Sequence, residues 1–220
     1  QYYFAIVKLC GQASIFKYLT EAKLAFDFND FTVTHTEKIQ EQLERQQEVF
    51  DVASPQRLAK LIHRLHLELK CSLRRAQSAD VLRYFHWAND PQTRAQSYQS
   101  APIPLEDHRV WFAKKIKTPE VYLYVLEYEK EPVGQIRFDQ LPEELVISYS
   151  IDRTQHGKGF GILLLSLGLE KIRQDCVEQL PITGLVKKNN IASVKAFLKF
   201  AFQQEESLSQ EKSYRFTLRS

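Results

Sequence analysis

Three glycines at alternate positions, Gly157, Gly159 and Gly161, constrain the possible fold of this 220-residue chain more than any other feature. They follow the run from Leu145 to Ile151, which is rich in β-branched residues and predicts a strand. They open the apolar-striped segment from Gly159 to Ile172, which predicts a helix. Glycine has no Cβ, so the backbone can approach a ligand closely. Because the amides at a helix N-terminus are unpaired and the helix dipole favours negative charge, the turn predicts a pyrophosphate site.

Two other phosphate-binding motifs fit this turn less well. The P-loop requires G-x-x-x-x-G-K-[ST], and that string does not occur in the chain. The dinucleotide fingerprint requires G-x-G-x-x-G early in a βαβ unit, with an acidic residue about 20 positions later. Here the spacing is G-x-G-x-G, late in the chain, with the positive charge of Lys158 inside it. On the glycines alone, a glycine-rich helix start without a ligand is the alternative.

Alternating strand and helix signals predict an α/β layer structure for residues 67–220. The expected strands are Leu67–Leu73, Val121–Leu126, Val133–Phe138, Leu145–Ile151, Ile182–Val186 and Tyr214–Leu218. The expected helices are Ala79–Trp87, Leu105–Ile116, Gly159–Ile172 and Ile191–Phe200. Residues 1–66 form a separate N-terminal segment with helical patterning at Thr36–Val49 and Ser54–Leu65, and we expect it to be small and mainly helical.

Composition argues against several classes of function. The 30 basic and 27 acidic residues are interspersed and give a net charge of +3, which argues against nucleic-acid binding. The three cysteines are far apart and odd in number, so we expect no metal site and a reducing, cytoplasmic setting. No apolar run reaches the roughly 20 residues of a membrane span. The chain starts at Gln1 and contains no Met, so we expect a fragment or a processed product.

Two motifs in the same order make the stretch from Leu67 to Leu218 resemble the GNAT acetyltransferase superfamily. The coenzyme A motif of that family, R/Q-x-x-G-x-G/A, is matched from His156 to Gly161, with His156 at the position of the Arg or Gln. Its N-x-x-A/S motif is matched by Asn190-Ile191-Ala192-Ser193, and its Y-x-K-x-G-F motif by the F-L-K-F-A-F run that begins at Phe197. The resemblance implies a mixed, mostly antiparallel sheet that splays between its fourth and fifth strands, with flanking helices.

The resemblance also implies that acetyl-CoA is the acetyl donor. In the family the pantetheine arm enters between the fourth and fifth strands and pairs with the fourth, while the glycine turn holds the pyrophosphate. The residues that the resemblance assigns to this role are Tyr149, Ser150, Ile151, His156, Gly157, Lys158, Gly159, Phe160, Gly161, Asn190, Ser193 and Phe197.

Acetyl transfer to an amine requires a proton acceptor for the amine and a fate for the leaving thiolate. The usual donor to the thiolate is the Tyr seven residues after the motif Asn, and Phe197 stands there. Tyr149 with Ser193 could serve instead, or the thiolate could leave unaided, since a thiol pKa of about 8.5 makes it a tolerable leaving group. The third alternative is a domain that binds acetyl-CoA without turnover.

The candidate bases are Glu144, with Glu143 and Asp139 close to it in sequence, and His108. The intrinsic pKa of a histidine suits proton transfer near neutral pH. The alternative interpretation of each carboxylate is a solvated turn residue, and that of His108 is a surface histidine.

The stretch from Phe85 to Phe112 carries the information on the acceptor. Its run W-x-N-D-P-x-x-R-x-x-S, followed by I-x-L-E-x-H-x-x-W-F, resembles GNAT acetyltransferases of bacterial nucleotide-sugar pathways, in particular pseudaminic acid synthesis. The resemblance implies that the acceptor is the 4-amino group of a UDP-linked deoxy amino sugar. The substrate-binding residues that it assigns are Trp87, Asn89, Arg94, Ser97 and His108. The alternative is that the aromatic residues belong to the core of two amphipathic helices.

The front of the chain supports the same pathway. The stretch from Val49 to Leu65 resembles the end of the UDP-sugar hydrolase of that pathway, with Phe50-Asp51-Val52 where I-D-G is usual. Residues 1–66 are then the remnant of a nucleotide-sugar hydrolase domain. The alternatives to a nucleotide-sugar acceptor are a protein N-terminal amine, as in ribosomal-protein acetyltransferases, another small amine, or a non-catalytic acetyl-CoA-binding module. The expected partner is a small molecule, and the chain is expected to be a monomer or a homodimer.

Overall fold

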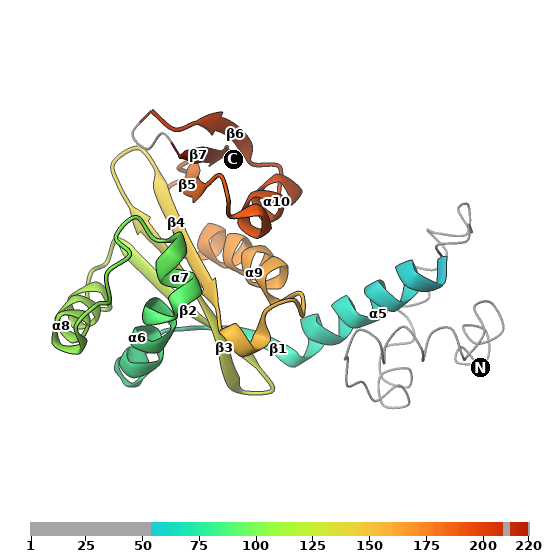
Figure 1. Ribbon diagram of the computed structural model, residues 1–220, viewed down its shortest axis with the longest axis horizontal. Coiled ribbons are helices and arrows are strands. Elements are labelled where there is room, and N and C mark those ends of the chain that lie inside the picture. Colours follow the sequence, from blue (N-terminus) through green and yellow to red (C-terminus); the bar gives the residue numbers. More distant parts are fainter. Residues whose placement is uncertain (1–53, 209–211, 220) are drawn as a thin grey trace. The chain divides into compact units, whose positions relative to one another are not determined.

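The computed structural model describes residues 54–208 and 212–219 (Figure 1). The chain divides into two compact units, Gln1–Lys70 and Cys71–Ser220. The helix expected at Thr36–Val49 and the hydrolase-like Phe50-Asp51-Val52 lie outside the described residues. The described elements are α5 (Ser54–Lys70), β1 (Cys71–Arg75), η1 (Ser78–Asp80), α6 (Val81–Asn89), α7 (Pro91–Gln96), α8 (Leu105–Lys115), β2 (Val121–Tyr128), β3 (Glu131–Gln140), β4 (Leu145–Ile151), η2 (Arg153–Gln155), α9 (Phe160–Asp175), β5 (Ile182–Lys187), α10 (Ile191–Lys199), β6 (Gln203–Glu206) and β7 (Ser213–Leu218).

Helix α5, in the first unit, is longer than the sequence predicts. It continues past Leu65 to Lys70, so the strand predicted from Leu67 is wrong over its first four positions, and β1 begins only at Cys71. The alternation in Leu67–Lys70 imitates a strand, but no Gly or Pro stops the helix there. Arg64 Nε donates to Glu68 Oε1 at 2.7 Å, one turn later, which supports the helical path. None of the helices in the described ranges combines the length and the apolar character that a bilayer crossing requires.

The second unit is built on one seven-stranded sheet in the order β1-β2-β3-β4-β5-β7-β6. Within the described sheet all neighbouring strands are antiparallel except β4 and β5, which are parallel. That parallel pair is in register at two positions, Leu145 with Ile182 and Val146 with Thr183. The strands separate beyond this point, so the expected mixed sheet that splays between its fourth and fifth strands is confirmed.

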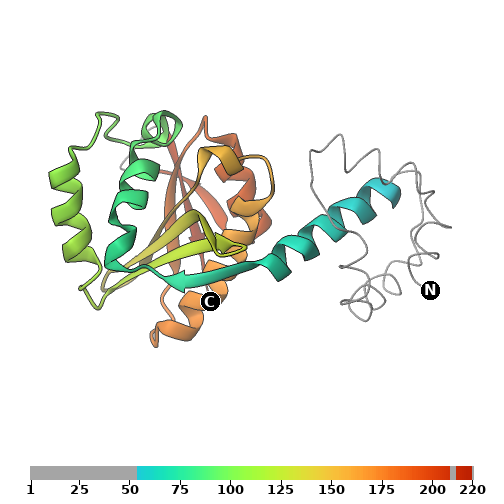
Figure 2. The ribbon, with the colours of Figure 1, turned by 90° about the horizontal axis from the view of Figure 1, so that it is seen from below.

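Helices cover both faces of the sheet, with α6 and α8 on one face and α9 on the other (Figure 2). We call the α6–α8 side the front face and the α9 side the back face. On the front, Tyr84, Trp87 and Phe112 pack in one core cluster with residues of β2. On the back, a Cβ added to Gly168 of α9 would lie 2.6 Å from Ile136 Cδ1 of β3, so glycine permits this close approach.

The side chains of β4 alternate between the two faces. Ser150 pairs with Gln135, which pairs with Val125 of the front cluster. Tyr149 pairs with Ile136, which packs under α9. Successive residues of a strand point to opposite faces, so Val146, Ser148 and Ser150 face the front and Ile147, Tyr149 and Ile151 face the back.

Helix α7, strand β6 and the short 3-10 helices η1 and η2 are absent from the sequence prediction as separate elements. Helix α7 is short, and it is started by Asp90, whose side chain accepts from the amides of Gln92 and Thr93. Strand β6 is an edge strand whose four residues are all exposed, so no apolar alternation reveals it. The other elements predicted within the described residues are present, with bounds that differ from the prediction by at most a few residues.

Candidate active site

The loop between β4 and α9 presents backbone amides, as the glycine pattern predicts. Gly157 and Gly159 have φ angles of +77° and +89°, in the left-handed region that favours glycine. Gly159 is the N-cap residue of α9, and within the described chain no side chain caps this helix. The first-turn amides are therefore open to an anion. A Cβ at Gly157 would meet no described atom within 4 Å, so the loop is also sterically open.

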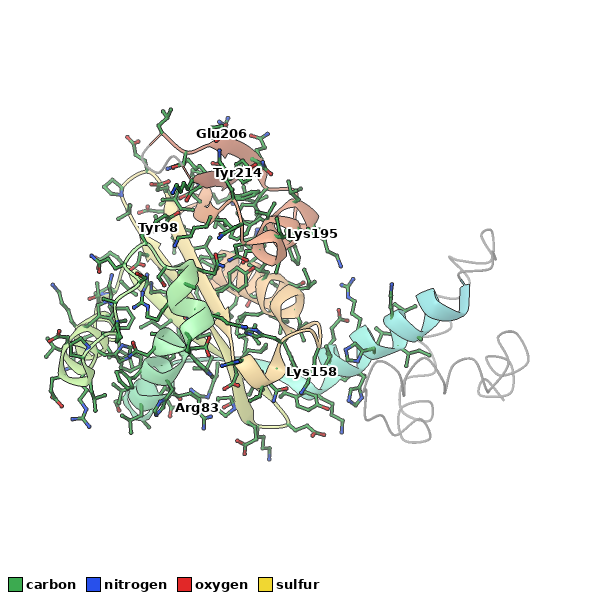
Figure 3. The ribbon with its side chains drawn as sticks, in the orientation of Figure 1. Arg83, Tyr98, Lys158, Lys195, Glu206 and Tyr214 are labelled. Atoms are coloured by element: carbon green, nitrogen blue, oxygen red, sulfur yellow. The ribbon has the colours of Figure 1, made fainter. Side chains whose placement is uncertain are left out.

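His156 and Lys158 both turn toward neighbours in the loop. His156 Nε2 lies 2.9 Å from the carbonyl oxygen of Ile151, at the end of β4. Lys158 Nζ donates to Gln155 Oε1 at 3.0 Å, and Figure 3 shows Lys158 on the loop that precedes α9. His156 thus links the loop to the end of β4, while Lys158 contributes positive charge beside the N-terminus of α9.

The gap between β4 and β5 exposes one edge of β4. The segment from Ile147 to Ile151 pairs with β3 on one side, and it has no partner among the described strands on the other. An extended amide-containing arm can bind such an edge as an additional strand does. On the β5 side, Asn190 Oδ1 accepts from the Ser193 amide at 3.2 Å and starts α10. Tyr149, Ser150 and Asn190 therefore border the same opening.

Tyr149 provides a hydroxyl group at this opening. Its OH donates to Ser193 Oγ at 3.1 Å, which joins the back of β4 to the first turn of α10. Burial raises the pKa of Tyr149, although the hydrogen bond with Ser193 opposes this effect. The phenol is therefore protonated at neutral pH and can act as a proton donor.

Phe197 belongs to an aromatic cluster behind the gap. It is 2% exposed, and its ring centroid lies 4.6 Å from that of Phe202 and 5.1 Å from that of Phe216. A Cβ at Gly184 of β5 would approach the Phe197 ring to 3.0 Å, so glycine provides the space for this ring. The centroid of Tyr149 is 6.0 Å away. Phe197 itself carries no hydroxyl group, so its ring contact with Tyr149 and the hydrogen bond from Tyr149 to Ser193 make Tyr149 the candidate hydroxyl at this opening.

Glu144 lies at the closed end of the gap. Its Oε2 accepts from Thr183 Oγ1 at 2.7 Å and pairs with Arg215. Because Thr183 is in register with Val146, this contact is on the front face. Glu144 is therefore a held carboxylate with a balancing charge, not a solvated turn residue. It lies on the opposite face of the sheet from Tyr149.

His108 is buried, so the interpretation as a surface histidine is wrong. It is 3% exposed and lies in the helix pair α6–α8, with its ring centroid 5.3 Å from that of Trp111 and 5.6 Å from that of Phe85. Burial lowers the pKa of His108, and a hydrogen bond with the backbone of Val81 opposes this effect. Its Nε2 has no partner among the described residues. These contacts place His108 in the helix core.

The side chains of Trp87 and Asn89 make hydrogen bonds within the protein. Trp87 is 4% exposed, and its Nε1 donates to Asp152 Oδ2 at 2.9 Å. Asn89 Nδ2 donates to the Ile103 carbonyl at 3.0 Å, and Asn89 Oδ1 accepts from the Ile103 amide at 2.8 Å. The end of α6 is thereby tied to the loop after β4 and to the loop before α8.

Arg94 and Ser97 are likewise engaged inside their own segment. Arg94 Nη2 donates to the carbonyl of Gln99 at 2.6 Å. Ser97 Oγ donates to the carbonyl of Thr93 at 3.0 Å, one turn earlier. These bonds shape α7 and the turn that follows it.

The same segment is fastened to the far half of the sheet. Lys187 Nζ donates to the carbonyls of Ala95 at 2.9 Å and Ser97 at 2.8 Å, and Tyr98 OH donates to Ser213 Oγ at 2.9 Å. Lys187 and Ser213 are register partners in β5 and β7. Residues 95–98 therefore connect the helices of the front face to β5 and β7.

Sequence reasoning missed Asp152, Lys187 and Arg215. The string D-R-T after a strand could have indicated an Asx turn at Asp152, which accepts from the amide and hydroxyl of Thr154. Lys187 and Arg215 contact partners 90 and 71 positions away, Ser97 and Glu144. No local pattern signals contacts of that range.

Comparison with known proteins agrees with this geometry. The sequence model described as the acetyltransferase (GNAT) domain matches residues 70–203. The chain belongs to the GNAT acetyltransferase family. It is thus an acetyl-CoA-dependent N-acetyltransferase, and the expectations of family, enzyme class and acetyl donor are confirmed. No curated protein shows significant similarity to the chain. These matches do not support the expected nucleotide-sugar pathway, and they do not support a hydrolase remnant in residues 1–66.

Solved structures share the GNAT fold at low sequence identity. Spermidine N-acetyltransferase from Vibrio cholerae, in complex with CoA and spermine, gives a TM-score of 0.59 at 16% identity over 69% of this chain and 96% of its own. Ribosomal-protein-alanine N-acetyltransferase from Brucella melitensis gives 0.57 at 17% identity over 68% and 99%. An aminoglycoside acetyltransferase in complex with coenzyme A gives 0.58 at 16% identity over 68% and 94%. These likenesses establish the fold, and the named acceptors differ from one another.

Proposed function

We propose that this acetyltransferase acts on the 4-amino group of a UDP-linked deoxy amino sugar. The residue pattern from Trp87 to Phe112 supports the proposal, because it resembles acetyltransferases of nucleotide-sugar pathways. Acetyl-CoA supplies the acetyl group, and the acceptor reaches the gap from the front face.

Charge on the front face is the observation that carries the acceptor class. Asp139 pairs with Lys115 at 2.5 Å and with Arg137 at 2.7 Å, and Glu144 pairs with Arg215. In this described cluster three basic groups therefore balance two carboxylates. The cluster therefore carries one excess positive charge, which favours an anionic acceptor over a polycation. A diphosphate is the complementary guest, because guanidinium and ammonium groups bind its oxygens.

The proposed chemistry divides between the two faces. The amides at the start of α9 hold the pyrophosphate, and the free edge of β4 holds the pantetheine arm. On the front, Glu144 takes the proton of the acceptor amine through water. On the back, Tyr149, oriented by Ser193, donates a proton to the leaving thiolate. His108 supports the packing of α6 on α8.

Release of free thiol from acetyl-CoA tests this assignment. The panel holds a UDP-linked 4-amino sugar, the same sugar without the nucleotide, spermidine, and a peptide with an N-terminal alanine. We expect release with the UDP-linked sugar, and weaker release without the nucleotide. Release with the peptide alone would replace the proposal by a protein N-terminal acetyltransferase. Binding of acetyl-CoA with no release from any amine would indicate a non-catalytic binding module.

A further inference from the structure

One carboxylate, Asp152, lies where β4 ends and the glycine loop begins. Its Oδ1 accepts from the Thr154 amide at 2.9 Å and from Thr154 Oγ1 at 2.7 Å. Its Oδ2 accepts from Trp87 Nε1 at 2.9 Å. Its own amide donates to the carbonyl of Val133 in β3 at 2.8 Å. Asp152 therefore joins the start of the loop to β3, to η2 and to helix α6.

The charge of Asp152 strengthens these bonds. Burial would raise the pKa of Asp152, but hydrogen bonds from Thr154 and Trp87, with the nearby charge of Arg83, bring it below the usual value. The carboxylate is thus ionised at neutral pH. Hydrogen bonds to an ionised acceptor are roughly twice as strong as those between neutral groups.

Trp87 provides a fixed partner for this carboxylate. It is buried on the front face, and its ring centroid is 5.8 Å from that of Tyr84 in the same cluster. A packed indole ring cannot move its N–H without disturbing the core. The bond therefore holds the loop against the packed core of the front face, although Trp87 and Asp152 are 65 positions apart in sequence.

We propose that Asp152 is a positioning residue for acetyl-CoA, held in place by Trp87. By fixing η2, it orients the glycine turn so that the amides at the start of α9 point at the pyrophosphate. The N-cap Gly159 supplies no side chain that could do this, so the residues before it, among them Asp152 and His156, must order the loop. The inference rests on the pyrophosphate site described above and not on the identity of the acceptor.

Calorimetric titration with coenzyme A tests the proposal without an acceptor. Trp87→Phe removes the indole donor and keeps most of the ring, while Asp152→Asn places an amide where the carboxylate accepts. We expect each variant to bind coenzyme A about five- to tenfold more weakly. The double variant should bind no worse than Asp152→Asn alone, because an asparagine amide cannot satisfy both the indole and Thr154. The KM for acetyl-CoA should rise while that of the acceptor stays constant.

Tyr84→Phe is the matched control. The Tyr84 hydroxyl donates to the Tyr124 carbonyl at 3.0 Å, so it is also a buried bond from α6 to the sheet, but it does not touch the loop. We expect this variant to lose thermal stability and to keep its affinity for coenzyme A. Equal weakening in Tyr84→Phe, or unchanged affinity in a folded Trp87→Phe, would overturn the role of Asp152. A wild-type chain without affinity for coenzyme A would overturn this inference and the pyrophosphate site together.

Discussion

The loop before α9 and the segment around α7 are both rich in binding-type residues, but they use them differently. The loop offers main-chain amides and two glycines in the left-handed region, with its helix mouth uncapped in the described chain. The segment around α7 offers polar side chains, but those of Asn89, Arg94 and Ser97 each donate a hydrogen bond to a nearby main-chain carbonyl. Binding groups that belong to the main chain stay free for a ligand, because side chains elsewhere hold the fold together. A site made of side chains must share them with the fold.

A negative charge added at the start of α9 should have the largest effect, because it opposes pyrophosphate binding by the main-chain amides of the loop. We expect Gly161→Glu to weaken coenzyme A binding about 1000-fold, because it places a carboxylate against the pyrophosphate. Gly161→Ala is the control, since its Cβ would come no closer than 3.9 Å to Ile151 among the described atoms. We expect that variant to bind within about twofold of the wild type. Calorimetry measures both, and normal binding by Gly161→Glu would exclude a pyrophosphate at this helix.

Removing one hydroxyl tests whether a side chain does chemistry at the back of the gap. We expect Tyr149→Phe to lower kcat about 100-fold with little change in the KM for acetyl-CoA, because the thiolate loses its proton donor. Burial raises the pKa of Tyr149, so the alkaline limb of the kcat profile should lie above the usual phenol pKa of about 10 and vanish in the variant. An unchanged kcat would favour a thiolate that leaves without assistance.

The smallest expected effect concerns His108, where a substitution distinguishes a role in folding from a role in catalysis. Burial lowers the pKa of His108, so in the pH window just below the usual histidine pKa of about 6.5 the unfolded chain binds more protons at this residue than the folded chain. Stability should therefore fall as the pH falls through that window and recover above it. His108→Phe should flatten this dependence of stability on pH and leave kcat unchanged. Melting temperatures against pH measure the slope, and a large loss of kcat in a folded variant would instead make His108 a base.

The contrast between the two regions also explains what sequence reasoning could reach. Gly157, Gly159 and Gly161 were interpretable because helix starts and left-handed turns are local properties of the backbone. The roles of Trp87 and His108 could not be predicted, because the same residue type serves in a buried structural contact and in a ligand-binding site. The partner of Trp87 is Asp152, 65 positions away, and only the folded chain brings them together.

Element boundaries followed the same rule. Strand β4 was predicted at Leu145–Ile151, as observed, because its β-branched run lies between polar turns. Strand β6 was missed because an exposed edge strand of polar residues carries no burial pattern. The separation of β4 from β5 followed from the family resemblance, since no single stretch of sequence encodes a missing register.

The packing of Phe197 between Phe202 and Phe216 limits which side chains this position accepts. A tyrosine there would push a hydroxyl into an apolar contact beside Gly184, at a cost to folding. A second proton donor could therefore be added at this position only by giving up part of the packing that holds β5, β7 and α10 together.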